Sequence, residues 1–267
     1  MATVQAAAAA TTALEAYEPL AAYYDALTQS YAHDAWVDAL EDVLHANDLG
    51  GPRVLDAACG TGKSTLPWLK RGYEVAACDL SPGMVERARQ RLGLGPDRVF
   101  VADMRDLPEG EPYDVVSCLD DSVNYLLSQA DLDRALASMA GALRVGGALL
   151  FDCNSMSLYR ERFISSWETC ANGYRFVWRG EADREIQPGE CFTAFLDVRH
   201  AAEYSLHSVT STVHRQRHHP ASSVRRALAA GGLQLRTVLG QSPGARLSDP
   251  PDEERHPKIL YLAQRVA

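Results

Sequence analysis

The segment Asp56–Gly62 reads Asp-Ala-Ala-Cys-Gly-Thr-Gly, and it decides the fold of this chain. It begins within a short apolar run, Arg53–Ala57, that has the character of a buried strand, and it precedes a helical pattern around Trp68. Glycines at positions 60 and 62 allow a tight turn and a close approach of the backbone to a ligand. In doubly wound sheets ligands bind at the carboxyl ends of strands, so we expect a ligand at this turn.

Strand and helix patterns alternate on both sides of this turn. Ser81-Pro82 is typical of a helix start, with a serine cap and proline at the first helical position. The predicted strands are Arg53–Ala57, Tyr73–Asp79, Arg98–Ala102, Asp114–Leu119 and Ala148–Asp152. This alternation predicts an α/β fold with a doubly wound, mostly parallel sheet.

The alternation ends after Asp152, and aromatic and β-branched runs follow without a good helix between them. We predict an inserted antiparallel sheet, a helix over Ser222–Ala230 and two last strands that complete a seven-stranded main sheet. The runs of the insertion are Tyr174–Trp178, Cys191–Val198 and Ala202–Thr212, and the last strands are Leu233–Leu239 and Lys258–Val266. The predicted organisation is a flexible tail (1–16), an N-terminal helical lid (17–49), a Rossmann-like domain (50–156 and 214–267) and the insertion over the active site (157–213).

Composition narrows the function classes. The chain has 267 residues and a formal net charge of -9, and an acidic surface repels nucleic acid, so we expect a small-molecule substrate and no nucleic-acid partner. No apolar run is long enough to cross a bilayer, and the alanine-rich start lacks the basic residues of a secretory signal, which favours the cytoplasm. The six cysteines lack metal-ligand spacing, so we expect no metal. A homodimer stays open as an alternative to a monomer.

The glycine turn resembles two nucleotide-binding motifs, but each motif requires a glycine that this sequence lacks. A dinucleotide fold needs a third glycine three residues after Gly62, and that position is Thr65. A phosphate-binding loop needs a glycine before Gly62-Lys63-Ser64, at the position that Ala57 occupies. Both interpretations are therefore disfavoured.

The ends of the next two predicted strands carry acids. Asp79 ends the second strand and could accept hydrogen bonds from both hydroxyls of a ribose. Asp103 follows the third strand and precedes Met104, and an acid beside a thioether suits the amine and the ring of an adenine. Suitable chemistry at three successive strand ends is stronger evidence than any one of them.

These motifs resemble those of the class I (Rossmann-like) S-adenosylmethionine-dependent methyltransferases. The resemblance rests on Val54–Gly62, Cys78–Ser81 and Ala102–Met104. It implies S-adenosyl-L-methionine as cofactor, with its methionine part on the glycine turn, its ribose on Asp79 and its adenine amine on Asp103. The cofactor-binding residues that it implies are Ala58 and Gly60 through their backbone, Asp79, Leu80, Met84, Asp103, Met104, and Leu119 beneath the methionine.

Further segments resemble a bacterial small-molecule subgroup of this family that has an antiparallel insertion. They are Tyr24-Asp25 with Tyr31 and Trp36, then Asp121–Leu126, and Leu150–Asp152. The resemblance implies that the N-terminal helices close over the cofactor, with Tyr24 or Tyr31 and Trp36 near its sulfonium. Core packing is the alternative explanation for these aromatic residues.

Methyl transfer needs alignment and exclusion of water, and a hydroxyl or carbon acceptor also needs a base. We favour His33 with Tyr24 as the acid/base pair, and Asp120 or Asp121 as an acid that faces the pocket. Asn154 and Glu168 are candidates for orienting an acceptor. The other candidate bases are His200, His207, His214, His218 and His219.

We therefore expect methylation of a small molecule on N, O or C, in secondary metabolism. A protein that binds the cofactor without methyl transfer, such as a regulator or a cyclase, would carry the same cofactor motifs and is the alternative.

Overall fold

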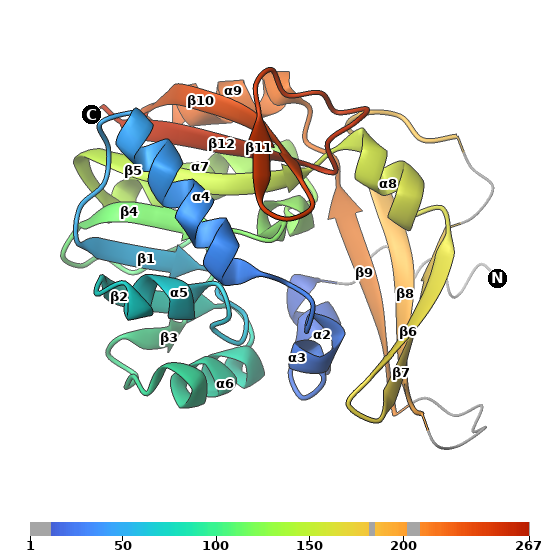
Figure 1. The fold of residues 1–267 in the computed structure, drawn as a ribbon. Coiled ribbons are helices and arrows are strands. Elements are labelled where there is room, and N and C mark those ends of the chain that lie inside the picture. Colours follow the sequence, from blue (N-terminus) through green and yellow to red (C-terminus); the bar gives the residue numbers. More distant parts are fainter. Residues whose placement is uncertain (1–11, 182–184, 202–208, 267) are drawn as a thin grey trace.

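The computed structural model describes residues 12–181, 185–201 and 209–266, and its centre is an eight-stranded sheet. The strand order is β11-β10-β12-β5-β4-β1-β2-β3 (Figure 1). The strands are β1 (Arg53–Ala57), β2 (Glu74–Asp79), β3 (Val99–Val101), β4 (Tyr113–Cys118), β5 (Leu143–Asn154), β10 (Leu233–Ser242), β11 (Arg246–Ser248) and β12 (Lys258–Arg265).

Pairing is parallel from β3 through β2, β1 and β4 to β5, whereas β12 pairs antiparallel with both β5 and β10. The predicted doubly wound, mostly parallel sheet is thereby confirmed. The sheet has one strand more than the seven predicted, because β11 adds to the edge. That strand has three residues, which is too short for a pattern of alternation to be recognised in the sequence.

Helices cover both faces of the sheet. One face carries α4 (His33–Ala46), α5 (Thr65–Lys70) and α6 (Pro82–Leu92), and the other carries α7 (Gln129–Ala142) and α9 (Ala221–Ala230). The start of α6 is the predicted one, since the Ser81 side chain accepts a hydrogen bond from the Met84 N–H and Pro82 is the first helical residue. Gly93 ends α6 in the left-handed conformation.

The N-terminal region divides into two parts with different roles. Helix α4 packs its apolar stripe on β1, β4, β5 and β12 and forms a layer of the core, while its first residue, His33, lines a cavity; the lid role expected of residues 17–49 stays a prediction. Helices α2 (Ala13–Tyr17) and α3 (Tyr24–Leu27) lie between the main sheet and the inserted sheet (Figure 1). The predicted tail 1–16 falls largely on residues 1–11, outside the described residues, and its end is helical, because Thr12 and Glu15 form a capping box for α2.

The inserted sheet is antiparallel, with the order β6-β7-β8-β9, and follows helix α8 (Met156–Arg162). Its strands are β6 (Ser166–Ala171), β7 (Tyr174–Gly180), β8 (Cys191–His200) and β9 (Thr210–Arg217). Strand β6 escaped prediction because it is a largely exposed edge strand without an apolar face. The predicted run Ala202–Thr212 falls mostly on residues 202–208, outside the described residues, and β9 extends past the expected boundary at 213.

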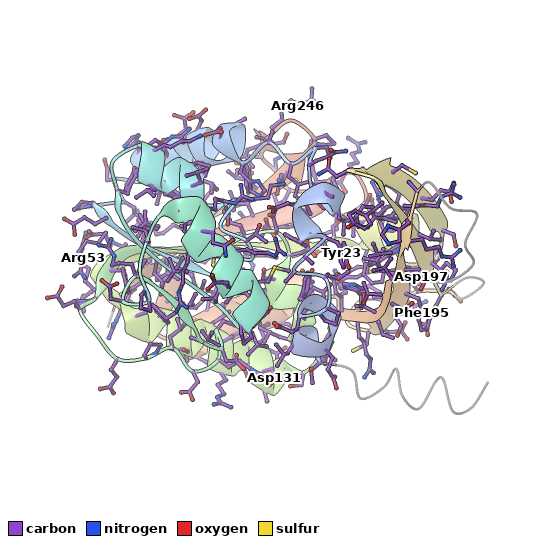
Figure 2. All side chains as sticks on the ribbon, turned by 90° about the horizontal axis from the view of Figure 1, so that it is seen from below. Tyr23, Arg53, Asp131, Phe195, Asp197 and Arg246 are labelled. Carbon is purple, nitrogen blue, oxygen red and sulfur yellow. The ribbon has the colours of Figure 1, made fainter. Side chains whose placement is uncertain are left out.

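Figure 2 shows how the two sheets are separated along the molecule. Arg53, at the start of β1, lies at one end, and Phe195 and Asp197 of β8 lie at the other, with Tyr23 between them. The rings of Tyr23 and of Tyr174 in β7 pack edge to face, with 4.9 Å between the ring centroids. Within the described ranges, no helix is long and apolar enough to span a membrane.

Candidate active site

The turn after β1 is held by the buried carboxylate of Asp56. It accepts hydrogen bonds from the hydroxyls of Ser64 at 2.7 Å, Thr65 at 2.6 Å and Ser117 at 2.8 Å. Burial raises the pKa of Asp56, and these hydrogen bonds partly offset the rise. Thr65, the residue that replaces the third glycine of a dinucleotide motif, therefore helps to fix the turn.

The glycine turn brings the backbone close to its neighbours. Ala58 and Gly60 adopt left-handed conformations, with φ of 57° and 55°. A Cβ built on Gly60 would lie 3.6 Å from Cε1 of Tyr24, so that ring covers the turn. A Cβ on Gly62 would lie 3.3 Å from Cα of Ala88 in α6, so this glycine permits close packing of the turn on the helix.

Asp79 joins the end of β2 to the glycine turn. Its carboxylate accepts the backbone N–H groups of Gly60 at 2.8 Å and Ser81 at 2.9 Å. Burial raises the pKa of Asp79 to about 6, although both hydrogen bonds oppose the rise. The carboxylate is thus fixed in place, and it faces a cavity.

This first cavity has a volume of about 270 Å³ and opens at the carboxyl ends of β1 to β4. All the predicted cofactor-binding residues except Tyr31 and Trp36 line it. They are Ala58, Gly60, Asp79, Leu80, Met84, Asp103, Met104 and Leu119. The N-terminal segment closes it with Thr12, Ala13, Leu14 and Tyr17. Their individual roles toward a cofactor stay predictions.

Asp103 has a partner that the sequence interpretation missed. The guanidinium of Arg105 pairs with it at 2.6 Å and also contacts Asp131 at 3.0 Å. Burial would raise the pKa of Asp103, but the hydrogen bonds from Arg105 outweigh it and lower that pKa. Arg105 and Asp131 also line the cavity, and the spacing of Arg105 two residues after Asp103 was the available signal.

A second cavity, of about 590 Å³, lies between the main sheet and the inserted sheet. The two cavities share Tyr17, Tyr24, Asp120 and Tyr125, so these side chains stand at the boundary between them. Asn154 and Glu168, the candidates for orienting an acceptor, both line the second cavity.

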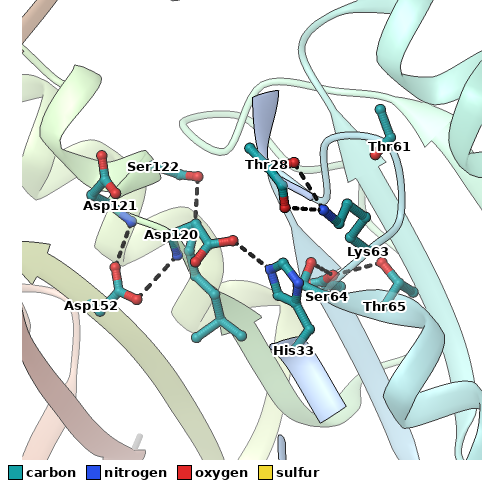
Figure 3. Close-up of polar contacts among 12 residues, drawn as sticks. Thr28, His33, Thr61, Lys63, Ser64, Thr65, Asp120, Asp121, Ser122 and Asp152 are labelled. Atoms are coloured by element: carbon teal, nitrogen blue, oxygen red, sulfur yellow. Dashed lines mark hydrogen bonds and ion pairs between the residues drawn. The ribbon is translucent and has the colours of Figure 1, made fainter. Parts of the chain in front are cut away.

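His33 and Asp120 form a pair at this boundary, with 2.7 Å between Nε2 and Oδ2 (Figure 3). The sequence predicted Tyr24 as the partner of His33, but in the structure the hydrogen-bond partner of His33 is Asp120. Asp120 and Asp121 both have left-handed backbones, with φ of 57° and 55°, and their N–H groups donate to the carboxylate of Asp152. This turn after β4 aims the Asp120 side chain at His33.

Lys258 of β12 balances part of the charge of these acids. Its Nζ lies 2.7 Å from Asp121, 3.6 Å from Asp152 and 3.8 Å from Asp120. Burial alone would raise the pKa of Asp120, but the His33 hydrogen bond and the Lys258 charge lower it. Burial raises the pKa of Asp152 to about 6.

The predicted aromatic residues have separate positions. Tyr24 lines both cavities, and burial raises its pKa well above the usual value, which disfavours the phenolate. Tyr31 is half-exposed and lines the second cavity alone. Trp36 is only 4% exposed, packs in the core beneath α4 and lines neither cavity. Trp36 therefore packs in the core, which was the alternative explanation for this residue.

The second cavity also contains Gln216, which the sequence did not single out, and His214, one of the candidate bases. Gln216 donates to Asp121 at 2.7 Å and accepts from Asn154 at 2.9 Å. The hydroxyl of Tyr125 and Nδ1 of His214 are 2.8 Å apart, and burial lowers the pKa of His214 to about 4, so this imidazole is neutral. The pattern of β9 predicts only a strand, and no local signal showed which of its side chains face the cavity.

The remaining histidine candidates divide between structural positions and the surface. His218 pairs with Glu253 at 2.8 Å, and Nε2 of His219 hydrogen-bonds the Val123 carbonyl at 3.1 Å. His200 is exposed at the end of β8. His207 lies outside the described residues.

The first cavity has the chemistry that S-adenosylmethionine requires. Asp79 offers a fixed carboxylate to a ribose, and Leu80, Met84 and Met104 offer apolar surfaces to an adenine ring. The left-handed turn at Ala58 and Gly60 presents its backbone to the amino-acid end. The donor and acceptor set therefore fits this cofactor.

Comparison with known proteins agrees with this geometry. A family model described as a methyltransferase domain matches residues 54–147. The protein YqeM of Bacillus subtilis, whose name describes it as a methyltransferase, is 30% identical over 73% of this chain and 89% of its own length. A dTDP-3-amino-3,4,6-trideoxy-alpha-D-glucopyranose N,N-dimethyltransferase of Streptomyces venezuelae is 29% identical over 68% of this chain and 83% of its length.

Solved structures give the same assignment. The sugar N-methyltransferase KedS8 from a Streptoalloteichus species has a TM-score of 0.67 and 26% identity, over 90% of both chains. An S-adenosylmethionine-dependent methyltransferase from Clostridium acetobutylicum has a TM-score of 0.75 at 21% identity, over 94% of this chain and 99% of its own, which shows a shared fold. With a matching family model, matching relatives and a cavity that fits the cofactor, the chain belongs to the class I S-adenosylmethionine-dependent methyltransferases.

Proposed function

We propose that this enzyme methylates an amine on a small polar acceptor that occupies the second cavity, with its amino group against Asp120. The observation that carries the proposal is the position of this carboxylate. Asp120 lines both cavities, is 26% exposed and is hydrogen-bonded to His33. A carboxylate at that boundary attracts an ammonium group and accepts a hydrogen bond from an N–H.

The charges around the second cavity support a cationic acceptor. Asp120, Asp121 and Asp152 surround the single ammonium of Lys258. The pKa of Asp152 is about 6 and the pKa of Asp120 is lowered, so both of these carboxylates are mostly ionised at neutral pH, and the single ammonium of Lys258 neutralises only part of their charge. The excess of negative charge favours an amine over a phosphate or a carboxylate at this position.

The relatives support the same acceptor class. Two curated relatives are named N,N-dimethyltransferases of amino-deoxy sugars, and KedS8 is named a sugar N-methyltransferase. The net charge of -9 opposes binding of nucleic acid. An amine on a small metabolite is therefore favoured over a hydroxyl or a macromolecule.

Each side chain has a defined task in this proposal. The bound cofactor supplies an electrophilic methyl group on its sulfonium. Tyr17, Tyr24 and Tyr125 exclude water from the boundary, and exclusion of water strengthens the interactions of Asp120. Asp120 accepts the N–H of the acceptor and orients its lone pair, and His33 holds the carboxylate and shares the proton that the amine releases.

The test is transfer of a labelled methyl group to matched acceptors. We expect incorporation into amino sugars and small amines, with release of S-adenosylhomocysteine, and none into the matching hydroxyl compounds. Asp120→Asn is expected to reduce this incorporation, whereas Glu109→Gln at an exposed surface acid is the matched control. Transfer only to hydroxyl compounds, protein or nucleic acid contradicts the proposal.

We also infer that the enzyme works in the cytoplasm, in secondary metabolism, without a nucleic-acid partner. The sugar-modifying relatives support a role in secondary metabolism, and the net charge of -9 opposes a nucleic-acid partner. A homodimer stays an open alternative, and light scattering of the purified protein measures it directly.

A further inference from the structure

Lys63 is the lysine of the Gly62-Lys63-Ser64 sequence, and neither the rejected phosphate-loop motif nor the family resemblance gives it a task. It follows the glycine turn and lines the first cavity. Its ammonium donates to the carbonyl oxygen of Thr28 and, at 3.0 Å, to the Thr28 hydroxyl (Figure 3). It also lies 5.8 Å from the centre of the Tyr31 ring.

Among the described residues, the Lys63 ammonium has no carboxylate in direct contact, unlike the guanidinium of Arg105 in the same cavity. Arg105 pairs with the carboxylates of Asp103 and Asp131, whereas the hydrogen bonds of Lys63 go to the neutral oxygens of Thr28. Among the residues whose positions the structure gives, no carboxylate lies within 4.0 Å of the Lys63 ammonium. Burial lowers the pKa of Lys63, and the charges of Asp25 and Asp120, neither within ion-pair distance, only partly oppose the fall.

The position of Lys63 selects one end of the cofactor. In Figure 3 the His33 ring lies between Lys63 and Asp120, and Asp120 stands at the boundary of the two cavities. Asp79 and Asp103, by contrast, lie at the ends of β2 and β3, where ribose and adenine are expected. The group nearest to Lys63 is then the amino-acid end of the cofactor, which carries a carboxylate.

We infer that Lys63 binds the carboxylate at the amino-acid end of S-adenosylmethionine and, through Thr28, connects it to the wall of the acceptor cavity. A charged hydrogen bond between ammonium and carboxylate stabilises binding more than the neutral contacts to Thr28 do. Thr28 and Tyr31 line the second cavity, so the same lysine contacts both sites. The inference concerns the cofactor and does not depend on the acceptor proposed above.

Two ligands that differ only at the amino-acid end test the inference. S-adenosylhomocysteine carries the carboxylate, whereas 5′-methylthioadenosine keeps the adenine, ribose and sulfur without it. In Lys63→Met, we expect calorimetry to show affinity for S-adenosylhomocysteine about 10- to 100-fold lower, and affinity for 5′-methylthioadenosine within about twofold of the unchanged chain. Binding of 5′-methylthioadenosine also reports that the variant has folded.

Matched variants separate binding from support of the fold. Lys70→Met removes an exposed lysine at the end of α5 and is expected to change neither affinity. Lys63→Arg keeps the charge and is expected to recover part of the affinity for S-adenosylhomocysteine. Equal losses for both ligands in Lys63→Met, or no loss for S-adenosylhomocysteine, would overturn the inference.

Discussion

Cofactor affinity is expected to depend on pH through Asp79. This carboxylate has a pKa of about 6 in the structure, because burial outweighs the N–H groups of Gly60 and Ser81. A ribose donates its hydroxyl hydrogens to the ionised carboxylate, and a protonated Asp79 loses acceptor capacity. The cofactor therefore prefers the ionised form, and its affinity rises as the pH rises through about 6.

The size of the effect follows from that pKa. If only ionised Asp79 binds, the apparent dissociation constant is multiplied by one plus the ratio of protonated to ionised acid. With a pKa of about 6, that factor is about 11 at pH 5 and about 1.1 at pH 7. We thus expect about a tenfold gain in affinity from pH 5 to pH 7, which is about 1.4 kcal/mol.

Calorimetric titration of S-adenosylhomocysteine between pH 5 and pH 7.5 measures this gain. The control is Asp79→Asn, whose amide does not titrate, and which should bind more weakly with a flat profile over the same range. A flat profile in the unchanged chain, or an unchanged slope in Asp79→Asn, would refute the assignment of the titration to Asp79.

Four substitutions test the rest of the site. Asp120→Asn should lower kcat/KM by about 10²- to 10⁴-fold with unchanged affinity for S-adenosylhomocysteine, and a loss of that affinity would count against a role at the acceptor. Asp56→Ala should lower the free energy of unfolding in urea by about 2–4 kcal/mol, since three buried hydroxyls lose their acceptor. Tyr125→Phe removes the hydroxyl that contacts His214 and should reduce kcat/KM by about tenfold, while the unfolding free energy falls by less than about 1.5 kcal/mol. An unchanged rate would exclude Tyr125 from acceptor positioning. Trp36→Ala should cost about 3–5 kcal/mol of unfolding free energy and leave the cofactor affinity of the folded protein intact, which calorimetry at low temperature can verify.

The cofactor half of the molecule was predictable from the sequence because its signals are local. In a parallel sheet, the residue that ends a strand lies at the ligand edge, so strand boundaries near Ala57, Asp79 and Ala102 were enough to place Ala58, Asp79 and Asp103 around one cavity. The Ser81 cap is likewise encoded within a few residues.

The acceptor half was less predictable because it is assembled from distant segments. Lys258 lies opposite Asp120 only because β12 pairs antiparallel with β5, and His214 reaches Tyr125 only through the inserted sheet. Trp36 is a residue for which the sequence suggested a position near the cofactor and the structure shows a position in the core. A tryptophan on a helical stripe has the same sequence signature in a core as over a ligand, and only the packing of α4 on the sheet distinguishes them.

The boundary formed by Tyr17, Tyr24, Asp120 and Tyr125 also has an evolutionary consequence. On the cofactor side, most lining residues come from one continuous stretch, residues 58–131, whereas the acceptor side draws on the N-terminal helices, the inserted sheet and β12. Substitutions in the inserted sheet can therefore alter which metabolite is accepted while the donor half keeps its fixed geometry. Exchange of residues 166–217 between homologues is thus a rational route to chimeric enzymes with new acceptor preference and unchanged use of the methyl donor.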